Sequence, residues 1–329
     1  MIKKTVLLLL LAGLLSAAAA VGWFYSQSGI VHAPAKAVEV MIPKGASSQK
    51  IAQLLARHDV IASEQLFRLQ VRLDGNGGRL RSGLYRFEKP ATMAEVIDRI
   101  LRGDVMHFQV TIPEGLRTDE VLVLLAEKTG SEVKEWQAAI KQLFPVDAEG
   151  RLLPETYQYS KPIRITQMLK AMVQAQKKIL AELSSDVPTQ NRLRIMASII
   201  EKETMIAKER PLVAAVIRNR LQKGMALQMD PTVIYGIWRT TGSFSGNIRK
   251  KDLSADTPWN TYTRKGLPPT PIGNPGVASL RAAAAPADSP FLFFVADGSG
   301  GHQFATTFTD HQANVARWVR IERSKNRGK

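Results

Sequence analysis

A strand-turn-helix pattern that occurs twice places the strongest restriction on the fold of this 329-residue chain. Each copy has an alternating strand, a Pro-Gly turn and an amphipathic helix that begins at a hydroxyl residue. Seven pairs of positions match at a constant offset of 70 residues: Ile42 and Ile112, Pro43 and Pro113, Gly45 and Gly115, Ser48 and Thr118, Ile51 and Val121, Leu54 and Leu124, and Leu55 and Leu125. The chain therefore contains an internal repeat of an α+β unit.

The segment between the two copies predicts one more unit of the same kind. Residues 80–101 read as a short strand, a turn at Pro90, a cap at Thr92 and a helix. We therefore expect a small α+β module over residues 38–108. Its pattern resembles LysM-like units, which bind N-acetylglucosamine polymers, although a structural spacer that binds nothing has the same pattern.

The N-terminus predicts a single transmembrane helix over residues 5–25. This run has no charged residue and is long enough to cross a hydrocarbon core of about 30 Å. Residues 23–25 are Trp, Phe and Tyr, which suit a membrane interface. The alternative is a signal peptide cleaved after the small residues at 18–20.

Either interpretation carries the rest of the chain out of the cytosol. Lys3 and Lys4 precede the apolar run, so residues 1–4 are expected to be a cytoplasmic tail and residues 26–37 a linker. We expect a single-pass protein of the inner membrane, with the bulk of the chain in the periplasm.

Composition removes several classes of function. The chain has no cysteine, and its five histidines form neither an H-E-x-x-H pattern nor a pair at i, i+4, so we expect no metal site. The net charge of +16 suits anionic lipid or cell-wall polymer. No nucleic-acid-binding motif is present, so we expect no nucleic-acid partner.

The remaining chain is expected to contain two regions and a tail. Residues 109–185 form a second α+β region, and a polar stretch at 181–191 marks a junction. Residues 186–322 form a mixed α/β catalytic region, and residues 323–329 form a basic tail.

One carboxylate interrupts an apolar helical face in this catalytic region. Met196, Ile199, Ile200 and Glu203 follow the spacing i, i+3, i+4 and i+7, whereas Glu201 falls on another face. A carboxyl group held among apolar side chains has a raised pKa, as a general acid requires. The alternative is a surface glutamate paired with Lys208 or Arg210.

Polar and aromatic residues downstream of Glu203 suit a carbohydrate cleft. Gln228 and Asp230 precede a helix, and W-N-T-Y at 259–262 combines aromatic, amide and hydroxyl groups. Aromatic rings stack on the C–H faces of sugars, while sugar hydroxyls require donors and acceptors. Taken singly, each element also fits an ordinary capped turn or a core aromatic residue.

Six linked motifs resemble the YceG-like family of endolytic murein transglycosylases. They are A-S-I-I-E-K-E-T at 197–204, I-R-N-R-L at 217–221, L-Q-M-D-P-T-V-I-Y-G at 227–236, W-N-T-Y at 259–262, G-L-P-P-T-P-I-G-N-P-G at 266–276 and F-V-A-D-G-S-G-G-H-Q-F at 294–304. Their order and spacing agree with the family across nearly the whole chain after the N-terminal apolar run.

The resemblance implies a lyase that cleaves the β-1,4 bond between N-acetylmuramic acid and N-acetylglucosamine inside nascent glycan strands. The products would carry 1,6-anhydro ends, and the cut would end strand growth near peptidoglycan synthases. The family's catalytic acid and base falls on Glu203, and no cofactor is required. The substrate-binding residues implied by the motifs are Gln228, Asp230, Asn260, Thr261 and Tyr262.

Two departures from the family pattern affect only expected substrate contacts. Glu155 stands where the family often has Asp, and Met229 stands where a small polar residue is common. A non-catalytic cell-wall-binding scaffold is one alternative function. A water-using muramidase is another, with Asp230 as its second carboxylate.

Overall fold

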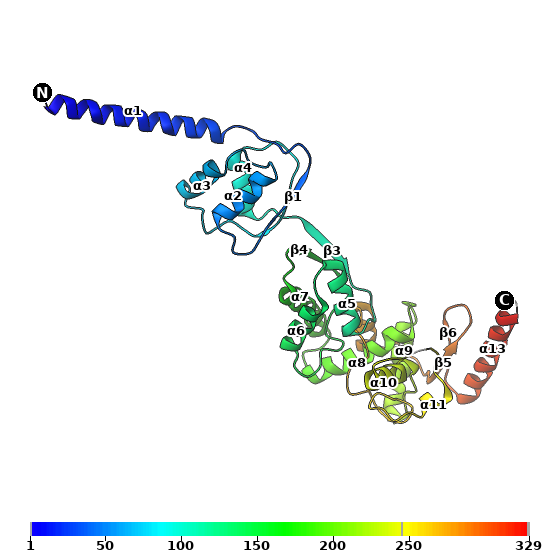
Figure 1. The fold of residues 1–329 in the computed structure, drawn as a ribbon. Helices are drawn as coiled ribbons and strands as arrows, with labels where there is room; N and C mark the ends of the chain where they lie inside the picture. The colour runs from blue at the N-terminus through cyan, green and yellow to red at the C-terminus, as the bar shows by residue number, and fades with distance from the viewer. Residues whose placement is uncertain (1, 245, 328–329) are drawn as a thin grey trace. The chain divides into compact units, whose positions relative to one another are not determined.

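The computed structural model describes residues 2–244 and 246–327, with side chains left out at 2–9, 17, 20, 25, 28 and 325–327. The chain divides into two compact units (Figure 1). Unit 1 is Met1–Gln109 with Gln158–Arg164, and unit 2 is Val110–Tyr157 with Ile165–Lys329. The strands of the described residues form two-stranded sheets among many helices, which is a mixed α+β fold.

Unit 1 is built on an antiparallel strand pair with helices against it. Its elements are α1 (Ile2–Ser28), β1 (Val38–Ile42), α2 (Ser48–Arg57), α3 (Glu64–Leu73), β2 (Gly83–Phe87) and α4 (Met93–Arg102). Val40 pairs with Tyr85 in the sheet, and both side chains are fully buried. The alternation along β1 therefore directs one face of the sheet into the core.

The predicted repeat is present as two strand-turn-helix segments. Strands β1 and β3 (His107–Thr111) lead to α2 and α5 (Thr118–Thr129), and β3 pairs with β4 (Thr156–Ser160). Gly45 and Gly115 occupy the two turns with φ values of 75° and 77°, a region that favours glycine. Both turns therefore use the same backbone conformation.

Both helices of the repeat begin at the predicted hydroxyl residues, Ser48 and Thr118. A serine caps α2, since the Oγ of Ser47 accepts a hydrogen bond from the Lys50 N–H at 3.2 Å. Arg117 precedes α5, and Thr118 instead donates to Glu149. Thr92 caps α4 as expected, with Glu95 completing a capping box.

The predicted transmembrane segment lies in helix α1. Within the residues that the structure describes, no helix is both long and apolar enough to cross a membrane. The side chains of residues 5–9, part of the predicted span, lie outside the described set.

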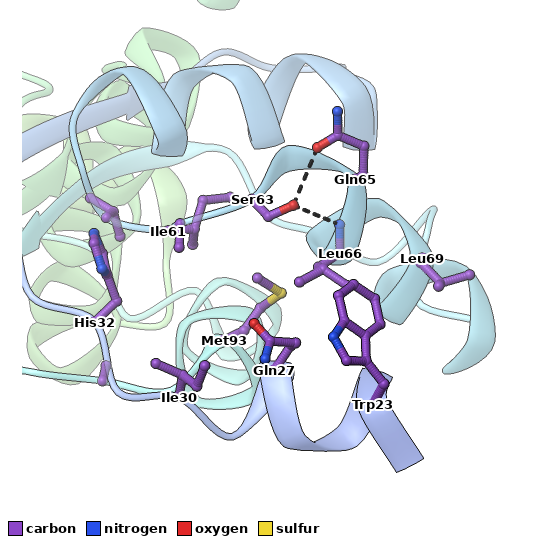
Figure 2. A pocket seen from close by; sticks show the side chains of 13 residues that line it. Trp23, Gln27, Ile30, His32, Ile61, Ser63, Gln65, Leu66, Leu69 and Met93 are labelled. Atoms are coloured by element: carbon purple, nitrogen blue, oxygen red, sulfur yellow. Dashed lines mark hydrogen bonds between the residues drawn. The ribbon is translucent and has the colours of Figure 1, made fainter. Parts of the chain in front are cut away.

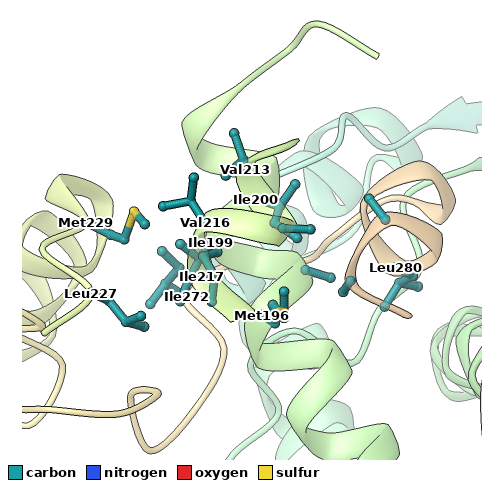
Figure 3. Close-up of a cluster of buried hydrophobic side chains, with 14 of the residues drawn as sticks. Met196, Ile199, Ile200, Val213, Val216, Ile217, Leu227, Met229, Ile272 and Leu280 are labelled. Carbon is teal, nitrogen blue, oxygen red and sulfur yellow. The ribbon is translucent and has the colours of Figure 1, made fainter. Parts of the chain in front are cut away.

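Unit 2 is mainly helical. Its further elements are α6 (Val133–Leu143), α7 (Ile165–Leu183), α8 (Val187–Glu203), α9 (Arg210–Gln222), α10 (Asp230–Thr241), α11 (Lys250–Leu253), α12 (Val277–Ala284), β5 (Phe293–Ala296), β6 (His302–Ala305) and α13 (Phe308–Arg327). Helix α8 packs against α7, α9, α10 and α12. Figure 3 shows Met196, Ile199 and Ile200 of α8 among apolar side chains that include Val216 of α9 and Leu280 of α12. The core thus fixes the helix that ends at Glu203.

Candidate active site

Glu203 is the last residue of α8. The helix ends there because Thr204 is extended, with φ −145° and ψ 135°, while its N–H still donates to the Ile200 carbonyl at 3.1 Å. Thr204 is buried and its hydroxyl donates to Glu209 at 3.0 Å. The position of Glu203 is therefore set by the buried helix before it and the anchored residue after it.

Glu203 lines an open pocket of about 690 Å³ in unit 2. One wall follows α8, and the other is the glycine-rich turn between β5 and β6. The lining residues are Lys202, Glu203, Thr204, Met205, Ile206, Ala296, Gly298, Ser299, Gly300, Gly301 and His302. Met205 is 89% exposed and adds an apolar surface at the pocket. A polymer can therefore reach this carboxyl group.

The surroundings of Glu203 favour its protonated form. Burial raises the pKa of Glu203 to about 8, and the negative charge of Asp230 raises it as well. Within the described chain, Glu203 has no salt-bridge partner. A carboxyl group that is protonated at neutral pH and reachable from a pocket can act as a general acid.

Glu201 has different surroundings although it lies two residues earlier. Its carboxylate accepts a hydrogen bond from Arg210 at 3.2 Å and another from the Gly276 N–H at 2.8 Å. Glu201 is 9% exposed, so the helical face on which it lies is buried as well. Arg210 pairs with Glu201 and Glu114, and so the alternative that it pairs with Glu203 is wrong.

Asp230 and Tyr262 lie close enough to Glu203 to interact with it electrostatically. Asp230 begins α10, and its carboxylate accepts a 2.6 Å hydrogen bond from the Tyr262 hydroxyl. Burial raises the pKa of Tyr262, and the charges of Asp230 and Glu203 add to this effect. These three predicted residues are therefore brought together electrostatically.

Gln228 precedes α10 in a left-handed backbone conformation, with φ 52°. Its N–H donates to the Thr261 carbonyl at 3.0 Å, and its side-chain oxygen accepts from Arg220 at 3.2 Å. Its side chain is exposed. Because a non-glycine residue in this region is uncommon, the two hydrogen bonds help to explain how the turn is held.

Asn260 and Thr261 are buried beneath this surface rather than exposed on it. Asn260 donates to the Leu253 and Ala255 carbonyls and accepts from the Tyr262 N–H at 2.8 Å. The Thr261 hydroxyl accepts from the Met229 N–H at 3.0 Å. Asn260 is 0% exposed and Thr261 is 2% exposed, so their side chains support the neighbouring segments from the protein interior.

The two departures from the family pattern lie in different environments. Met229 is 2% exposed and packs in the unit 2 core, which Figure 3 shows. Glu155 is exposed, and its backbone carbonyl accepts from the Ile112 N–H. Because Met229 is buried, its departure from the family pattern affects the packing of the unit 2 core.

The residues that sequence reasoning missed are Glu209 and His302. Glu209 accepts hydrogen bonds from the His302 N–H at 2.9 Å and from the His302 ring Nδ1 at 2.8 Å. Asp297 stabilises the turn between β5 and β6, because its carboxylate accepts hydrogen bonds from the N–H groups of Ser299 and Gly301. The family motif at 294–304 was the one signal that marked this loop.

Glu149 is a second carboxyl group with a raised pKa, and it lies outside the pocket. Burial raises the pKa of Glu149 to about 7, against hydrogen bonds from Thr118, Tyr235 and Gly150 that lower it. The Thr118 N–H donates at 2.9 Å and the Tyr235 hydroxyl at 3.2 Å. Glu149 is only 5% exposed and fully engaged, which indicates a structural role.

Unit 1 contains a pocket of about 560 Å³ with different chemistry. Figure 2 shows Trp23, Ile30, Leu66 and other mainly apolar side chains around it. Its titratable lining residue is His32, which contacts Asp59 at 2.9 Å. No carboxyl group lines this cavity among the described residues, so it offers no side chain for acid catalysis.

Comparison with known proteins identifies the family to which the chain belongs. The sequence profile of the YceG-like family matches residues 40–317. A relative from Bacillus subtilis (strain 168), named endolytic murein transglycosylase, is 30% identical over an alignment of 316 residues, with 88% of this chain and 86% of the relative covered. A longer relative of the same name from Streptococcus pneumoniae (strain D39) is 26% identical, with 94% of this chain and 64% of the relative covered.

A solved structure has the same fold. The crystal structure of a yceG-like protein from Listeria monocytogenes matches with a TM-score of 0.55 and 28% identity, covering 84% of this chain and 98% of that one. The family profile spans far more than half of the chain and includes Glu203, its pocket and the β5–β6 turn. This chain therefore belongs to the YceG-like family.

Proposed function

We propose that this protein is an endolytic peptidoglycan lytic transglycosylase, a lyase that cuts glycan strands internally at the bond between N-acetylmuramic acid and N-acetylglucosamine. The observation that carries the proposal is the Glu203 carboxyl group, which has no salt-bridge partner among the described residues and a pKa raised to about 8. It stands at an open pocket in a chain of the YceG-like family. Relatives named endolytic murein transglycosylase support the substrate class.

The proposed reaction needs one carboxyl group that acts twice. Protonated Glu203 gives its proton to the glycosidic oxygen as the bond from that oxygen to the anomeric carbon breaks. The Glu203 carboxylate then takes the proton of the muramic 6-hydroxyl while this oxygen bonds to the anomeric carbon. The products are a free N-acetylglucosamine hydroxyl and a 1,6-anhydro end, and no water is consumed.

The other predicted site residues take different roles in this proposal. Asp230 keeps Glu203 protonated through its charge, and Tyr262 holds Asp230 through the 2.6 Å hydrogen bond. Gln228 is exposed and contacts sugar directly. Asn260 and Thr261 position these residues from the buried side, because neither exposes its side chain.

The cellular setting is proposed on the sequence. We propose an inner-membrane protein anchored by residues 5–25, with the bulk of the chain in the periplasm, acting beside peptidoglycan synthases. The module at residues 38–108 is proposed as a LysM-like contact for glycan. The basic net charge of +16 favours such an anionic environment.

The test is to incubate the protein and its Glu203→Gln variant with nascent peptidoglycan and to identify chain ends by mass spectrometry. We expect 1,6-anhydro ends from the wild type and none from the variant, which retains the shape of the site but has no titratable acid. Reducing ends would indicate a water-using muramidase with Asp230 as second carboxylate. Binding without cleavage by either protein would indicate a scaffold.

A further inference from the structure

The β5–β6 turn brings a histidine into the pocket of Glu203. His302 is the first residue of β6 and lines the pocket together with Glu203. The residues before it are Gly300 and Gly301, which have no side chain to block the approach of a ligand. A Cβ at Gly301 would come within 2.8 Å of the Glu209 carboxylate, so this close approach requires glycine.

Glu209 fixes the position of His302. The carboxylate accepts from the backbone N–H of His302 at 2.9 Å and from its ring Nδ1 at 2.8 Å. The same carboxylate accepts from the Thr204 hydroxyl at 3.0 Å. Thr204 follows Glu203 directly, so one buried carboxylate connects the end of the catalytic helix to the turn that forms the opposite wall.

These contacts also determine which ring nitrogen carries the proton. Burial acts to raise the pKa of Glu209, but hydrogen bonds from His302 and Thr204 outweigh it and lower the pKa. An ionised carboxylate only accepts hydrogen bonds, so Nδ1 must donate. In the neutral ring Nε2 is then an acceptor. Phe294 meets the ring edge-on at 5.2 Å between centroids, and no hydrogen bond to Nε2 occurs within the described chain.

We propose that His302 contacts the glycan, accepting a hydrogen bond from a sugar hydroxyl at Nε2, and that Glu209 is the positioning residue that holds its ring and tautomer. The inference rests on the proposed function and adds a substrate-contacting side chain on the pocket wall formed by the β5–β6 turn. A carboxylate-oriented imidazole is well suited to hold one hydroxyl in one direction. The bound sugar ring would then be fixed between His302 and Glu203.

The binding test uses the full chain carrying Glu203→Gln, so that the ligand stays intact. The probe is a tetrasaccharide of alternating N-acetylglucosamine and N-acetylmuramic acid, titrated by calorimetry. His302→Asn is the informative variant, because its amide can still donate to Glu209 while the acceptor at Nε2 is lost. We expect affinity to fall about tenfold in His302→Asn and equally in His302→Ala. His302→Gln, which can place an acceptor near the Nε2 position, should recover part of it.

A spectroscopic readout separates contact from folding. In protein with ¹⁵N-labelled histidine, His302 should show a protonated Nδ1 and an unprotonated Nε2, and the tetrasaccharide should shift the Nε2 signal. Glu209→Gln should weaken this tautomer preference. Unchanged affinity in His302→Asn, or an Nε2 signal that does not respond to the sugar, would overturn the inference. Failure of the proposed function is recognised separately, as absence of 1,6-anhydro ends from the wild type.

Discussion

Glu203 and Asp230 are two carboxyl groups of one site, and the charge of Asp230 raises the pKa of Glu203. Glu203 must be protonated to begin the reaction, so the rate of anhydro-end formation should fall as the pH rises through about 8. In Asp230→Asn the negative charge that raises this pKa is gone. The alkaline limb should therefore move to lower pH by roughly half to one unit.

The control for this prediction is Tyr262→Phe, which removes the hydrogen bond to Asp230 and leaves its charge in place. Its alkaline limb should stay near that of the wild type even if its rate is lower. The measurement is the pH dependence of kcat/KM between about pH 5 and about pH 10. A limb that stays in place in Asp230→Asn would contradict the electrostatic role of this residue.

The sequence predicts a site residue well only where the hydrogen-bond partners of that residue lie close to it along the chain. The motif at 197–204 indicated Glu203, but periodicity alone could not describe Glu201, because α8 is buried on several sides. The partners of Glu201 lie 9 and 75 residues away, and those of Glu209 include a residue 93 positions away. Contacts of that range are set by tertiary packing, which local patterns do not contain.

At the scale of elements, Gly150 lies in the segment after α6 and packs closely against the loop before α12. It has φ 70°, and a Cβ there would lie 2.4 Å from the Cβ of Pro271. Gly130, which ends α5, also has φ 70° but has nothing within 4 Å of such a Cβ. Gly130→Ala should therefore lower the free energy of unfolding by about 1 kcal/mol, through the backbone alone.

Gly150→Ala has the same backbone strain and adds a clash with Pro271, so its loss should be larger by about 1–3 kcal/mol. Urea unfolding followed by tryptophan fluorescence measures both values. Equal losses in the two variants would mean that the loop before α12 moves aside, and that the close packing at Gly150 contributes little to stability.

Glu149 connects α5 to α10 through Thr118 and Tyr235, and it makes this connection sensitive to pH. Its folded-state pKa of about 7 lies above the ordinary value of 4.5. Between these values the folded protein binds more protons than the unfolded chain, so stability falls as the pH rises. Over this window the wild type should lose about 3 kcal/mol relative to Glu149→Gln, which does not titrate.

Urea midpoints of the wild type and Glu149→Gln at about pH 4.5 and about pH 8 measure this difference. A gap between the two proteins that stays the same at both values would show that folding does not raise the pKa of Glu149. The variant keeps an oxygen acceptor for the Thr118 N–H. The difference in stability between the two proteins at one pH therefore reports packing, and the change of that difference with pH reports the charge of Glu149.

The sequence predicted the elements better than their connections. The repeat at 38–55 and 108–125 specified strand, turn and helix because these depend on neighbours in the chain. The serine cap was predicted, but the pattern did not distinguish Ser47 from Ser48, since adjacent serines offer the same chemistry. The return of Gln158–Arg164 to unit 1 has no local signal, because strand pairing between β3 and β4 brings it there.

For the whole molecule, two forces could hold this protein at a membrane: the apolar N-terminal segment and the net charge of +16. Salt separates them, because charge attraction is screened within about 3 Å at about 1 M NaCl whereas insertion of an apolar helix is not. If residues 5–25 are an anchor, the full chain should stay with membranes washed at this salt concentration. A chain that starts at Val38 should be released.

Mass measurement of the protein from the membrane fraction completes this test. An intact N-terminus together with salt-resistant binding would establish the anchor. A mature chain that begins after Ala20 would instead identify a cleaved signal peptide. Release of an intact full-length chain by salt would mean that charge alone holds it, and that residues 5–25 have a role other than insertion, because about 20 apolar residues placed in hydrocarbon are not extracted by ions.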